Sequence, residues 1–369
     1  MSVTLTELVR RYDPGRPLEQ ACTIPAAWYL DPRMADLEQR TVFRRNWLAV
    51  AHVDAVREAG QFVTLGVGDE PLLVVRGRDG AVRGFHNVCR HHAAEVVREP
   101  VGRAAALKCP YHGWTYGLDG ALRGTPEFDG VAGFERADHG LVPVTVETAD
   151  PFVFVRLIDG GPTLNDHLGS LPELWRPLRV SELRFARRRT YDLDCNWKVF
   201  VDNYLDGGYH VPHIHGGLSG VLDYARYRIE NGPRFCVQSS PIRPAGEAAE
   251  TAAVRSGSTA YYFWLYPNFM INCYEGIMDT NLVLPQSVDR CRVIFDFYFG
   301  RSGPADEAVQ DRSIAVADRI QQEDIDICAS IQRGLRSSAY DVGRLSVRRE
   351  AGEHLFHRLL HADLSAGLP

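Results

Sequence analysis

The chain has 369 residues, of which 45% are hydrophobic and 24% are charged, and its formal net charge is −6. This composition predicts a globular protein with room for more than one hydrophobic core. No apolar run approaches the ~18 residues of a membrane span, and the mild acidity argues against nucleic acid as a partner. Eight cysteines in a sequence without an apolar leader favour a cytoplasmic protein whose thiols are free or bound to metal.

Helix and strand signals divide the chain. Asp31-Pro32 predicts an N-cap followed by proline at the first helical position, which opens a helix to about Trp47. The pattern then changes to short β segments, which are separated by turn signals such as Gly68-Asp69 and Asp79-Gly80. This strand pattern continues to a Gly-Gly-Pro boundary near residue 161.

These signals predict a small all-β module inserted into a larger domain. The three parts are an N-terminal segment of the larger domain (1–44), the module (45–158) and the rest of the larger domain (159–369). The last part has aromatic-rich strands over 258–300, and Gly303-Pro304 opens a long helix to about residue 335. Helices packed against an antiparallel sheet predict an α+β class.

Cysteine and histidine recur at two places in the β module. Cys89-Arg90-His91 is followed, after seventeen residues, by Cys109-Pro110-Tyr111-His112. Two thiolates and two imidazoles suit either zinc or an iron–sulfur cluster. Zinc fingers usually draw their cysteines from one knuckle and their histidines from another, whereas here each loop supplies one of each. This division favours a [2Fe–2S] cluster in which one iron takes both thiolates, with a structural zinc site as the alternative.

The motif C-x-H-x17-C-P-Y-H-G-W-T-Y closely resembles the Rieske motif, and its position is similar to that in the α subunit of Rieske-type non-heme iron oxygenases. The resemblance covers residues 28–362. It implies four cluster ligands: Cys89 and Cys109 on one iron, and His91 and His112 on the other. Trp114 and Tyr116 are expected to pack against the cluster or to form hydrogen bonds around it.

A second constellation lies in Asn196–His215. Its first half is patterned as an amphipathic helix, with a polar stripe of Asn203, Asp206 and His210, and Pro212 is expected to end the helix. Buried ionisable groups need partners, and a metal is the simplest one. A triad of two histidines and one carboxylate would suit non-heme Fe(II), because it leaves positions open for O₂.

His210 is the first candidate ligand, and spacing alone permits either His213 or His215 as the second. The H-x4-H pattern of the resembling family implies His215. The carboxylate must come from the helix near residue 324, which offers Glu323, Asp324 and Asp326.

Asp324 lies within an apolar stripe of this helix, whereas Asp326 lies with Glu323 on its polar face. The stripe consists of Ala317, Ile320, Ile327, Cys328 and Ile331. A buried carboxylate needs a charge partner, and the family's carboxylate ligand falls at the matching position. We therefore assign Asp324 as the third ligand.

The resemblance gives Asp206 a different role. In the family, an acidic residue just before the first histidine carries electrons from a Rieske histidine of the neighbouring subunit, which implies a head-to-tail homotrimer. The usual spacing is D/E-x2-H, whereas Asp206 and His210 are separated by three residues. We expect a helical bulge to absorb the extra glycine. Three further histidines, His354, His357 and His361, are interpreted as packing residues because no carboxylate is visibly poised with them.

The stretches DNYLDGGYHVPHIH and FWLYPNFMINCYEG are most similar to the choline monooxygenase group, whose members oxidise a carbon beside a quaternary nitrogen. Aromatic faces bind such cations. We predict a pocket of seven residues: Phe200, Tyr204, Tyr262, Trp264, Tyr266 and Phe269 as aromatic faces, and Glu275 for charge balance. The alternative is that these aromatics are only the inner face of the sheet.

The resemblance implies an oxygenase with a [2Fe–2S] cluster and mononuclear Fe(II), which uses O₂ and electrons from NAD(P)H to hydroxylate or oxidatively N-demethylate a small amine. The chain has no G-x-G-x-x-G or flavin motif, so a separate flavin/iron–sulfur reductase is expected to supply electrons, directly or through a ferredoxin. The alternatives are cis-dihydroxylation of an arene, tailoring of a natural product, and a Rieske electron-transfer protein, which would need only residues 45–158.

Overall fold

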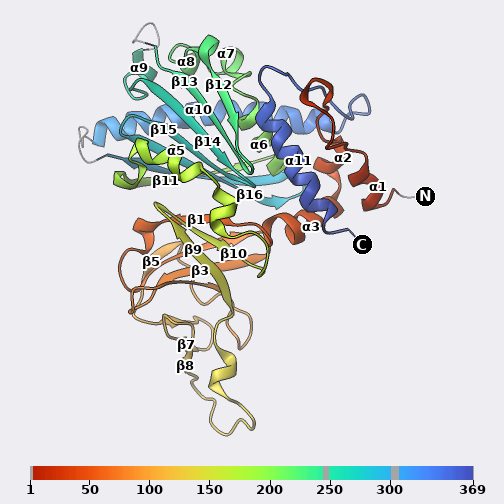
Figure 1. The fold of residues 1–369 in the computed structure, drawn as a ribbon. Helices are drawn as coiled ribbons and strands as arrows, with labels where there is room; N and C mark the ends of the chain where they lie inside the picture. The colour runs from red at the N-terminus through yellow and green to blue at the C-terminus, as the bar shows by residue number, and fades with distance from the viewer. Residues whose placement is uncertain (1–2, 244–248, 301–306, 369) are drawn as a thin grey trace. The chain divides into compact units, whose positions relative to one another are not determined.

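The computed structural model describes residues 3–243, 249–300 and 307–368. The chain folds into two compact units: Arg44–Leu164 forms one, and Met1–Phe43 together with Asn165–Pro369 forms the other. The smaller unit contains the whole of the interval 45–158. Helices and antiparallel sheets both occur (Figure 1), which confirms the predicted α+β class.

The smaller unit is built on antiparallel strands. Its seven-stranded sheet has the order β1-β10-β9-β4-β3-β2-β5, and a separate sheet has the order β6-β7-β8. The strands are β1 (Leu48–His52), β2 (Gln61–Val67), β3 (Glu70–Arg76), β4 (Val82–His86), β5 (Val101–Arg103), β6 (Leu107–Lys108), β7 (Thr115–Tyr116), β8 (Leu122–Gly124), β9 (Pro143–Ala149) and β10 (Phe152–Arg156). The β segments predicted before residue 88 are β1 to β4, whose apolar residues Phe62, Leu73 and Phe85 form a core with the two Cys/His loops.

The larger unit has one seven-stranded antiparallel sheet with the order β11-β17-β16-β15-β14-β13-β12. Its strands are β11 (Arg184–Leu193), β12 (Arg228–Asn231), β13 (Phe235–Pro241), β14 (Thr259–Leu265), β15 (Phe269–Tyr274), β16 (Ile277–Ser287) and β17 (Arg290–Phe299). The α-helices are α1 (Leu5–Arg10), α2 (Ala26–Leu30), α3 (Pro32–Glu38), α4 (Leu164–Leu168), α5 (Leu171–Trp175), α6 (Trp197–Leu205), α7 (Val211–Ile214), α8 (Gly216–Ser219), α9 (Ala249–Ala252), α10 (Glu307–Leu335) and α11 (Ala351–Ser365). Helix α10 crosses behind the strands in Figure 1 and packs on α6, which itself packs on β16 and β17.

The N-terminal helix begins as predicted but ends earlier. Asp31 caps α3 by accepting a hydrogen bond from the backbone N–H of Arg33 (2.9 Å), and Pro32 is its first residue. The helix continues as a π-helix only to Phe43 and does not reach Trp47. The physical reason is that the chain must extend to enter β1 at Leu48.

The helix of the second constellation ends at Leu205, so the prediction that Pro212 ends it is wrong. Gly207 (φ +70°) and Gly208 (φ +67°) come next in the left-handed conformation, which stops the helix. Pro212 instead lies in the first turn of α7, where its missing N–H is not needed. No bulge inside a helix is therefore required for the D-x3-H spacing, because the extra glycine lies in the linker between α6 and α7.

Helix α10 ends near Gly334 as expected, while Gly303-Pro304 lies outside the described residues. Its buried face differs from the predicted stripe, because Ile331 is 40% exposed and Gln332 is buried instead. The Oε1 atom of Gln332 accepts a hydrogen bond from the backbone N–H of Asn196 (2.9 Å), which explains the buried amide. Asp324 still lies on the inner side, one turn before the buried Cys328.

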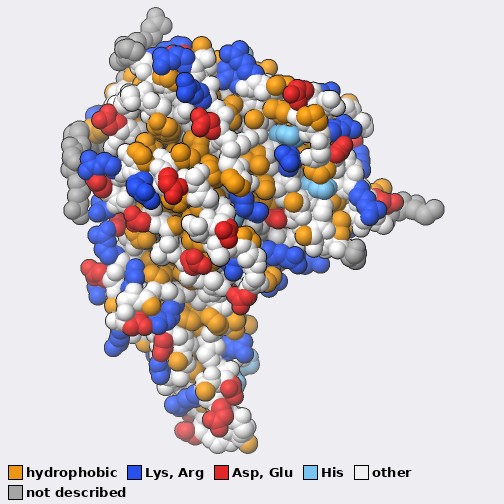
Figure 2. All heavy atoms as spheres, in the orientation of Figure 1, with side chains coloured by type: hydrophobic (Ala, Val, Ile, Leu, Met, Phe, Trp, Pro, Cys, Tyr) orange, Lys and Arg blue, Asp and Glu red, His pale blue; other side chains and the backbone are white. Residues whose placement is uncertain are grey.

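The surface charges are mixed on one face of the molecule, and the described cysteines form no disulfide. On the face drawn in Figure 2, lysine and arginine side chains are interspersed with aspartate and glutamate. All eight cysteines lie in the described ranges and are free thiols. Among the helices that the structure describes, none combines the length and the apolar character that a bilayer crossing needs.

Two candidate metal centres

Two loops of the smaller unit carry Cys and His side chains, and both loops have the same pattern of backbone hydrogen bonds. In the first, the N–H of Cys89 donates to the carbonyl of Ala94 (2.8 Å) and the N–H of Ala93 donates back to that of Cys89 (3.0 Å). In the second, Cys109 and Trp114 are joined in the same way (2.8 Å), and Gly113 donates back to Cys109 (3.1 Å). Ala93 and Gly113 both have positive φ, at 59° and 75°, which closes each loop. The two loops are thus local equivalents.

The four predicted cluster ligands are brought together by these loops. Cys89 and Cys109 are buried, and the rings of His91 and His112 lie 4.7 Å apart between centroids. His91 stacks on Trp114 at 4.8 Å. The hydroxyl of Tyr116 lies 3.3 Å from Cys89 Sγ. Trp114 and Tyr116 therefore surround the predicted ligands, as expected, while the neighbouring His92 is exposed.

The donor set fits a two-iron cluster, and a buried ring nitrogen of one predicted ligand supports this fit. Within the part of the chain that the structure describes, Nδ1 of His91 is buried and has no hydrogen-bond partner, which is what a nitrogen reserved for a metal would show. Burial raises the pKa of the Cys109 thiol, while the backbone N–H groups of Tyr111 and His112 favour its thiolate. Such N–H groups tune the potential of an iron–sulfur cluster when it is bound.

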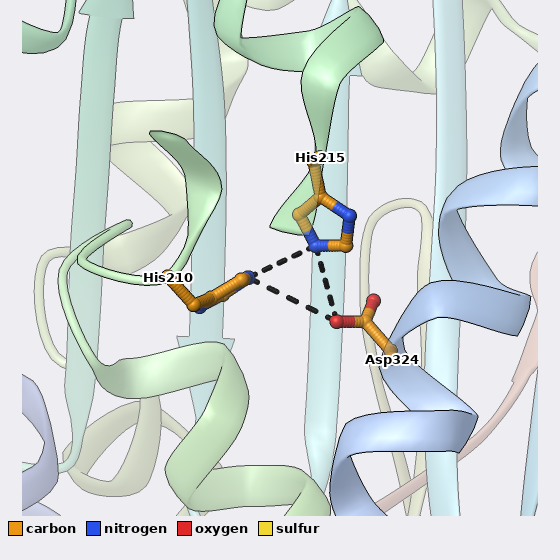
Figure 3. Close-up of side chains that lie close together, drawn as sticks. All are labelled: His210, His215 and Asp324. Carbon is orange, nitrogen blue, oxygen red and sulfur yellow. Dashed lines mark hydrogen bonds and ion pairs between the residues drawn. The ribbon is translucent and has the colours of Figure 1, made fainter. Parts of the chain in front are cut away.

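The second centre is formed by His210, His215 and Asp324 (Figure 3). The Nε2 atoms of the two histidines are 3.0 Å apart, and Oδ1 of Asp324 lies 3.1 Å from His215 Nε2 and 3.8 Å from His210 Nε2. These are ligand atoms that converge on one point from two segments far apart in sequence. His213, the other histidine that spacing permitted, is exposed, and Asp326 is exposed and accepts a hydrogen bond from Gln322 (3.0 Å).

Each histidine of the triad is oriented by a carboxylate at its other ring nitrogen. Asp206 Oδ2 lies 2.6 Å from His210 Nδ1, and Glu323 Oε2 lies 2.6 Å from His215 Nδ1. A carboxylate at Nδ1 fixes the tautomer that leaves Nε2 free for a metal. Asn203 also donates to Asp324 Oδ1 (2.8 Å). Sequence reasoning missed Glu323 because it placed this residue on the polar face, although its position beside Asp324 was the available signal.

The electrostatics of the triad favour a bound cation. Burial alone would lower the pKa of His215, but the carboxylates of Asp324 and Glu323 outweigh burial and leave it raised. These carboxylates hold a positive charge at His215, and a metal ion at Nε2 would replace the proton. The donor set of two imidazoles and one carboxylate fits Fe(II), because it leaves further coordination positions for other ligands.

The triad opens into a cavity whose floor is the sheet. Strand register places four side chains directly opposite one another on β13 to β16, which puts them in one row: Gln238, Tyr262, Asn272 and Asp279. All four line the cavity. Helix α6 contributes Phe200 and Tyr204 to its wall, and Gln321 of α10 also lines it. The cavity is therefore aromatic and polar at once, which suits a small polar ligand with an apolar portion.

Three of the seven predicted pocket residues line this cavity: Phe200, Tyr204 and Tyr262. The other four residues do not line it. Trp264 and Tyr266 lie further along the face of Tyr262 but pack against Phe356 of α11, at 5.6 and 6.4 Å between ring centroids. They were included because strand alternation shows which side chains share a face of the sheet. It does not show how far along that face the cavity extends.

Phe269 is buried in the core at the start of β15, away from the cavity lining, and Glu275 is exposed in the turn between β15 and β16. They were predicted because they lie in the aromatic-rich hairpin. Other residues of the same hairpin line the cavity. Tyr274 and the buried carboxylate of Asp279 line the cavity instead.

One of the three C-terminal histidines is buried as the packing interpretation expects, but it also has acidic partners that this interpretation did not foresee. His357 Nε2 lies 3.0 Å from Asp202 Oδ1 and 3.8 Å from Glu353 Oε1. Asp202 also accepts a hydrogen bond from the hydroxyl of Tyr29 (2.5 Å). His361 does pack, against Trp28 with nearly parallel rings.

Two family models match the chain: the Rieske [2Fe–2S] domain over residues 46–135, and the catalytic domain of the ring-hydroxylating α subunit over residues 180–366. The chain is 40% identical to the chloroplastic choline monooxygenase of Arabidopsis thaliana, over 98% of this chain and 87% of the relative. It is 31% identical to the carnitine monooxygenase oxygenase subunit of Escherichia coli K12, over 93% and 94%. A solved quaternary ammonium Rieske monooxygenase, described for carnitine oxidation, is similar with a TM-score of 0.85 at 26% identity, over 95% and 96%.

Proposed function

The chain belongs to the ring-hydroxylating oxygenase α-subunit family and carries a Rieske [2Fe–2S] domain, and on this premise we propose that it oxidises a small quaternary-ammonium or amine substrate with O₂. The observation that carries the proposal is the cavity that joins the histidine–carboxylate triad to aromatic side chains. Aromatic faces attract a quaternary nitrogen. Relatives that share most of this chain's length are a choline monooxygenase and a carnitine monooxygenase subunit.

The two cofactors of the family are a Rieske cluster and a mononuclear iron. We assign Cys89, Cys109, His91 and His112 as the ligands of the cluster, and His210, His215 and Asp324 as those of the iron. When bound, the two iron centres would supply the electrons and the O₂ chemistry that hydroxylate a C–H bond.

The residues around the centres orient and insulate them. Asp206 and Glu323 fix the histidine tautomers, and Tyr204, which is held by its hydrogen bond to Asn272 (2.8 Å), forms part of the wall that faces the substrate. A methyl group of a quaternary nitrogen that rested on Phe200 and Tyr262 would lie in the same cavity as the triad. Hydroxylation of that methyl group would give a hemiaminal that releases formaldehyde.

The assembly and the partners are part of the proposal. Asp206 is assigned as the electron relay from a neighbouring subunit, which implies a homotrimer, and a separate flavin/iron–sulfur reductase would supply the electrons. None of the eight cysteines, all of which the structure describes, is in a disulfide, which supports a reducing compartment such as the cytoplasm.

Substrate-dependent oxidation tests the proposed function. The purified holoenzyme with a reductase is given NADH and either trimethylammonium compounds or arenes, and NADH consumption and formaldehyde release are measured. We expect formaldehyde in proportion to NADH only with the trimethylammonium compounds. A cis-dihydrodiol from an arene, or no turnover of any trimethylammonium compound, would reject the substrate class.

Metal analysis tests the assignment of the ligands. Asp324→Ala should lose the mononuclear iron and keep the Rieske EPR signal, because the cluster ligands lie in the other unit. Asp326→Ala removes an exposed carboxylate two residues away on the same helix and should keep both centres. A colourless, zinc-containing protein would refute the cluster, and full iron content in Asp324→Ala would refute the triad.

A further inference from the structure

The cavity contains a buried arginine for which the described residues supply no paired carboxylate. Arg255 comes shortly after α9, is 3% exposed and lines the cavity. Its Nη1 atom donates to the hydroxyl of Ser313 on α10 (2.8 Å). Over the described ranges, no aspartate or glutamate forms an ion pair with Arg255, and its buried Nε has no hydrogen-bond partner. A buried guanidinium without an anion is unfavourable. Arg255 is therefore suited to pair with an anionic group of a ligand.

The guanidinium is held in a fixed position. It lies over the ring of Tyr274, 4.8 Å from the centroid, while Ser313 anchors one of its ends. Stacking and anchoring restrict a flexible side chain to one orientation, so little entropy remains to be lost when a ligand binds. Arg255 is therefore preorganised for binding a ligand.

The other buried charge of the cavity is already satisfied by neutral groups. Asp279 is 2% exposed, and its Oδ1 accepts hydrogen bonds from the amides of Asn272 (2.7 Å) and Asn281 (3.2 Å). Burial raises its pKa, although Arg255 acts in the opposite direction. Asp279 thus affects Arg255 through space without a direct contact, which leaves the Nε donor of Arg255 open.

A second donor of the cavity is also open. Among the described residues, the amide nitrogen of Gln321 is buried without a hydrogen-bond partner, and Gln321 lines the same cavity. Two unsatisfied N–H donors on residues that line one cavity point to a ligand that brings acceptor oxygens. Choline offers one hydroxyl, whereas a carboxylate offers two charged oxygens whose geometry matches guanidinium.

We propose that Arg255 binds a carboxylate of the substrate, so that this chain takes a zwitterion with a quaternary nitrogen and a carboxylate in preference to an amino alcohol such as choline. This inference rests on the proposed function and specifies its substrate. A zwitterion adds no net charge to the cavity, because its negative end meets Arg255 while its positive end meets the aromatic wall. A substrate without the carboxylate would leave the guanidinium unpaired.

The test compares two compounds that differ only at the far end. γ-Butyrobetaine and its methyl ester share the trimethylammonium group and the chain length, but the ester lacks the negative charge. In the wild-type holoenzyme, kcat/KM should be higher for the carboxylate. Arg255→Gln should lower the ratio of the two kcat/KM values by about 10- to 100-fold, as expected for a lost hydrogen bond to a charged group, and Arg255→Lys should restore part of it.

A matched control removes a positive charge nearby. Arg319→Gln lies on α10, where Arg319 is exposed and pairs with Glu250 (3.0 Å), and it should leave the ratio unchanged. Calorimetric titration of the holoenzyme with both compounds, in the absence of NADH, gives the same comparison for binding alone. Cluster absorbance and iron content verify that the Arg255 variants are folded.

The outcomes separate the two proposals. If neither trimethylammonium compound is oxidised by the wild type, the proposed function fails. If the ester or choline is oxidised as well as γ-butyrobetaine, or if Arg255→Gln weakens both compounds equally, the function stands and the carboxylate site is overturned. The wild-type preference alone decides the matter if Arg255→Gln does not fold.

Discussion

At the triad, each histidine turns one ring nitrogen toward the candidate metal site and the other toward a carboxylate. His210 is held by Asp206 and His215 by Glu323, both at 2.6 Å. The pairing fixes the ring planes that bring the Nε2 atoms together. The two carboxylates differ in exposure, since the side chain of Glu323 is 36% exposed and that of Asp206 is 15% exposed. Asp206 therefore orients its histidine from a largely buried position, and Glu323 does so from a partly exposed one.

Removal of Glu323 should weaken iron binding without affecting the cluster. We expect Glu323→Ala to lower the affinity for iron by about 10- to 100-fold, the usual effect of losing a carboxylate behind a ligating histidine. Competition with a chelator measures this affinity, and the Rieske EPR signal serves as the internal reference. Asp326→Ala is the matched control, because Asp326 is an exposed carboxylate of the same helix. Equal iron retention in both variants would show that Glu323 does not orient His215.

At this scale, motif and resemblance indicated the candidate ligands, but not the carboxylate of Glu323 that supports one of them. Cys89, His91, Cys109 and His112 are recognisable because a short loop must supply both a Cys and a His. Asp324 was found from the apolar residues one turn away, but Glu323 was assigned to solvent, because a helical wheel gives the direction of Cα–Cβ and not the reach of a long side chain. Arg255 carried no sequence signal, since its partners come from α10 and β15.

At the scale of elements, the break between α6 and α7 sets the geometry of the triad. Gly207 adopts φ +70°, and a Cβ atom there would lie 2.1 Å from the carbonyl oxygen of Arg349. Asp206, just before the break, accepts hydrogen bonds from the backbone N–H groups of Tyr209 (3.1 Å) and His210 (2.9 Å). The linker thus turns the chain so that Asp206 meets His210 across three residues, and the extra glycine belongs to this turn.

Gly207→Ala should disturb both stability and the iron site. A left-handed alanine costs of the order of 1–3 kcal/mol, and contact with a backbone carbonyl adds to it, so we expect a lower Tm and reduced iron content. Gly216→Ala is the control, because Gly216 is the residue directly after His215 and a Cβ there meets nothing within 4 Å. A Gly207→Ala protein with wild-type Tm and iron would show that the linker tolerates another conformation.

Helix α11 brings a buried carboxylate next to other acids. Burial raises the pKa of Glu353, and Asp202, Glu350 and Asp206 raise it further. A carboxyl group with a raised folded pKa contributes stability that is complete below its unfolded pKa of about 4.3 and is lost as pH rises through the folded value. Glu353→Gln should therefore flatten the fall in Tm above about pH 4.5 and stabilise the protein by about 1 kcal/mol at neutral pH. Thermal unfolding from pH 4.5 to 8 checks this, and parallel curves for the two proteins would contradict it.

The elements themselves were predictable where a single period governed them. The strands β1 to β4 and β14 to β17 match alternating or aromatic-rich runs, and α10 matches the long helix predicted to about residue 335. Helix ends were less predictable, because they depend on the conformation of the next segment of the chain. One helix ends at Phe43 because the chain must extend into β1, and another ends at Leu205 because two glycines with positive φ follow closely. The extent of the cavity could not be predicted, since Trp264 and Tyr266 share the face of Tyr262 but meet α11.

At the scale of the molecule, each compact unit has exposed residues at or beside its candidate metal centre. In the smaller unit His112 and Tyr111 are exposed, the latter to 64%. In the larger unit Tyr209 is 47% exposed, and it lies between Asp206 and His210. Surface access on both units is what transfer of electrons between separate chains requires, and it supports the assignment of Asp206 as a relay.

Mixed assemblies of two inactive variants would test transfer between subunits. Cys109→Ser should lack the cluster and Asp324→Ala the mononuclear iron, so neither should turn over alone. In co-expressed mixtures about a quarter of the interfaces of a cyclic assembly would join an intact cluster to an intact iron, and we expect a comparable fraction of wild-type activity. Adding Asp206→Asn to the Cys109→Ser chain, which holds the working iron, should abolish this recovery. Adding it to the Asp324→Ala chain should not. If electrons travelled only within one chain, no mixture would recover activity, and the position of Asp206→Asn would make no difference.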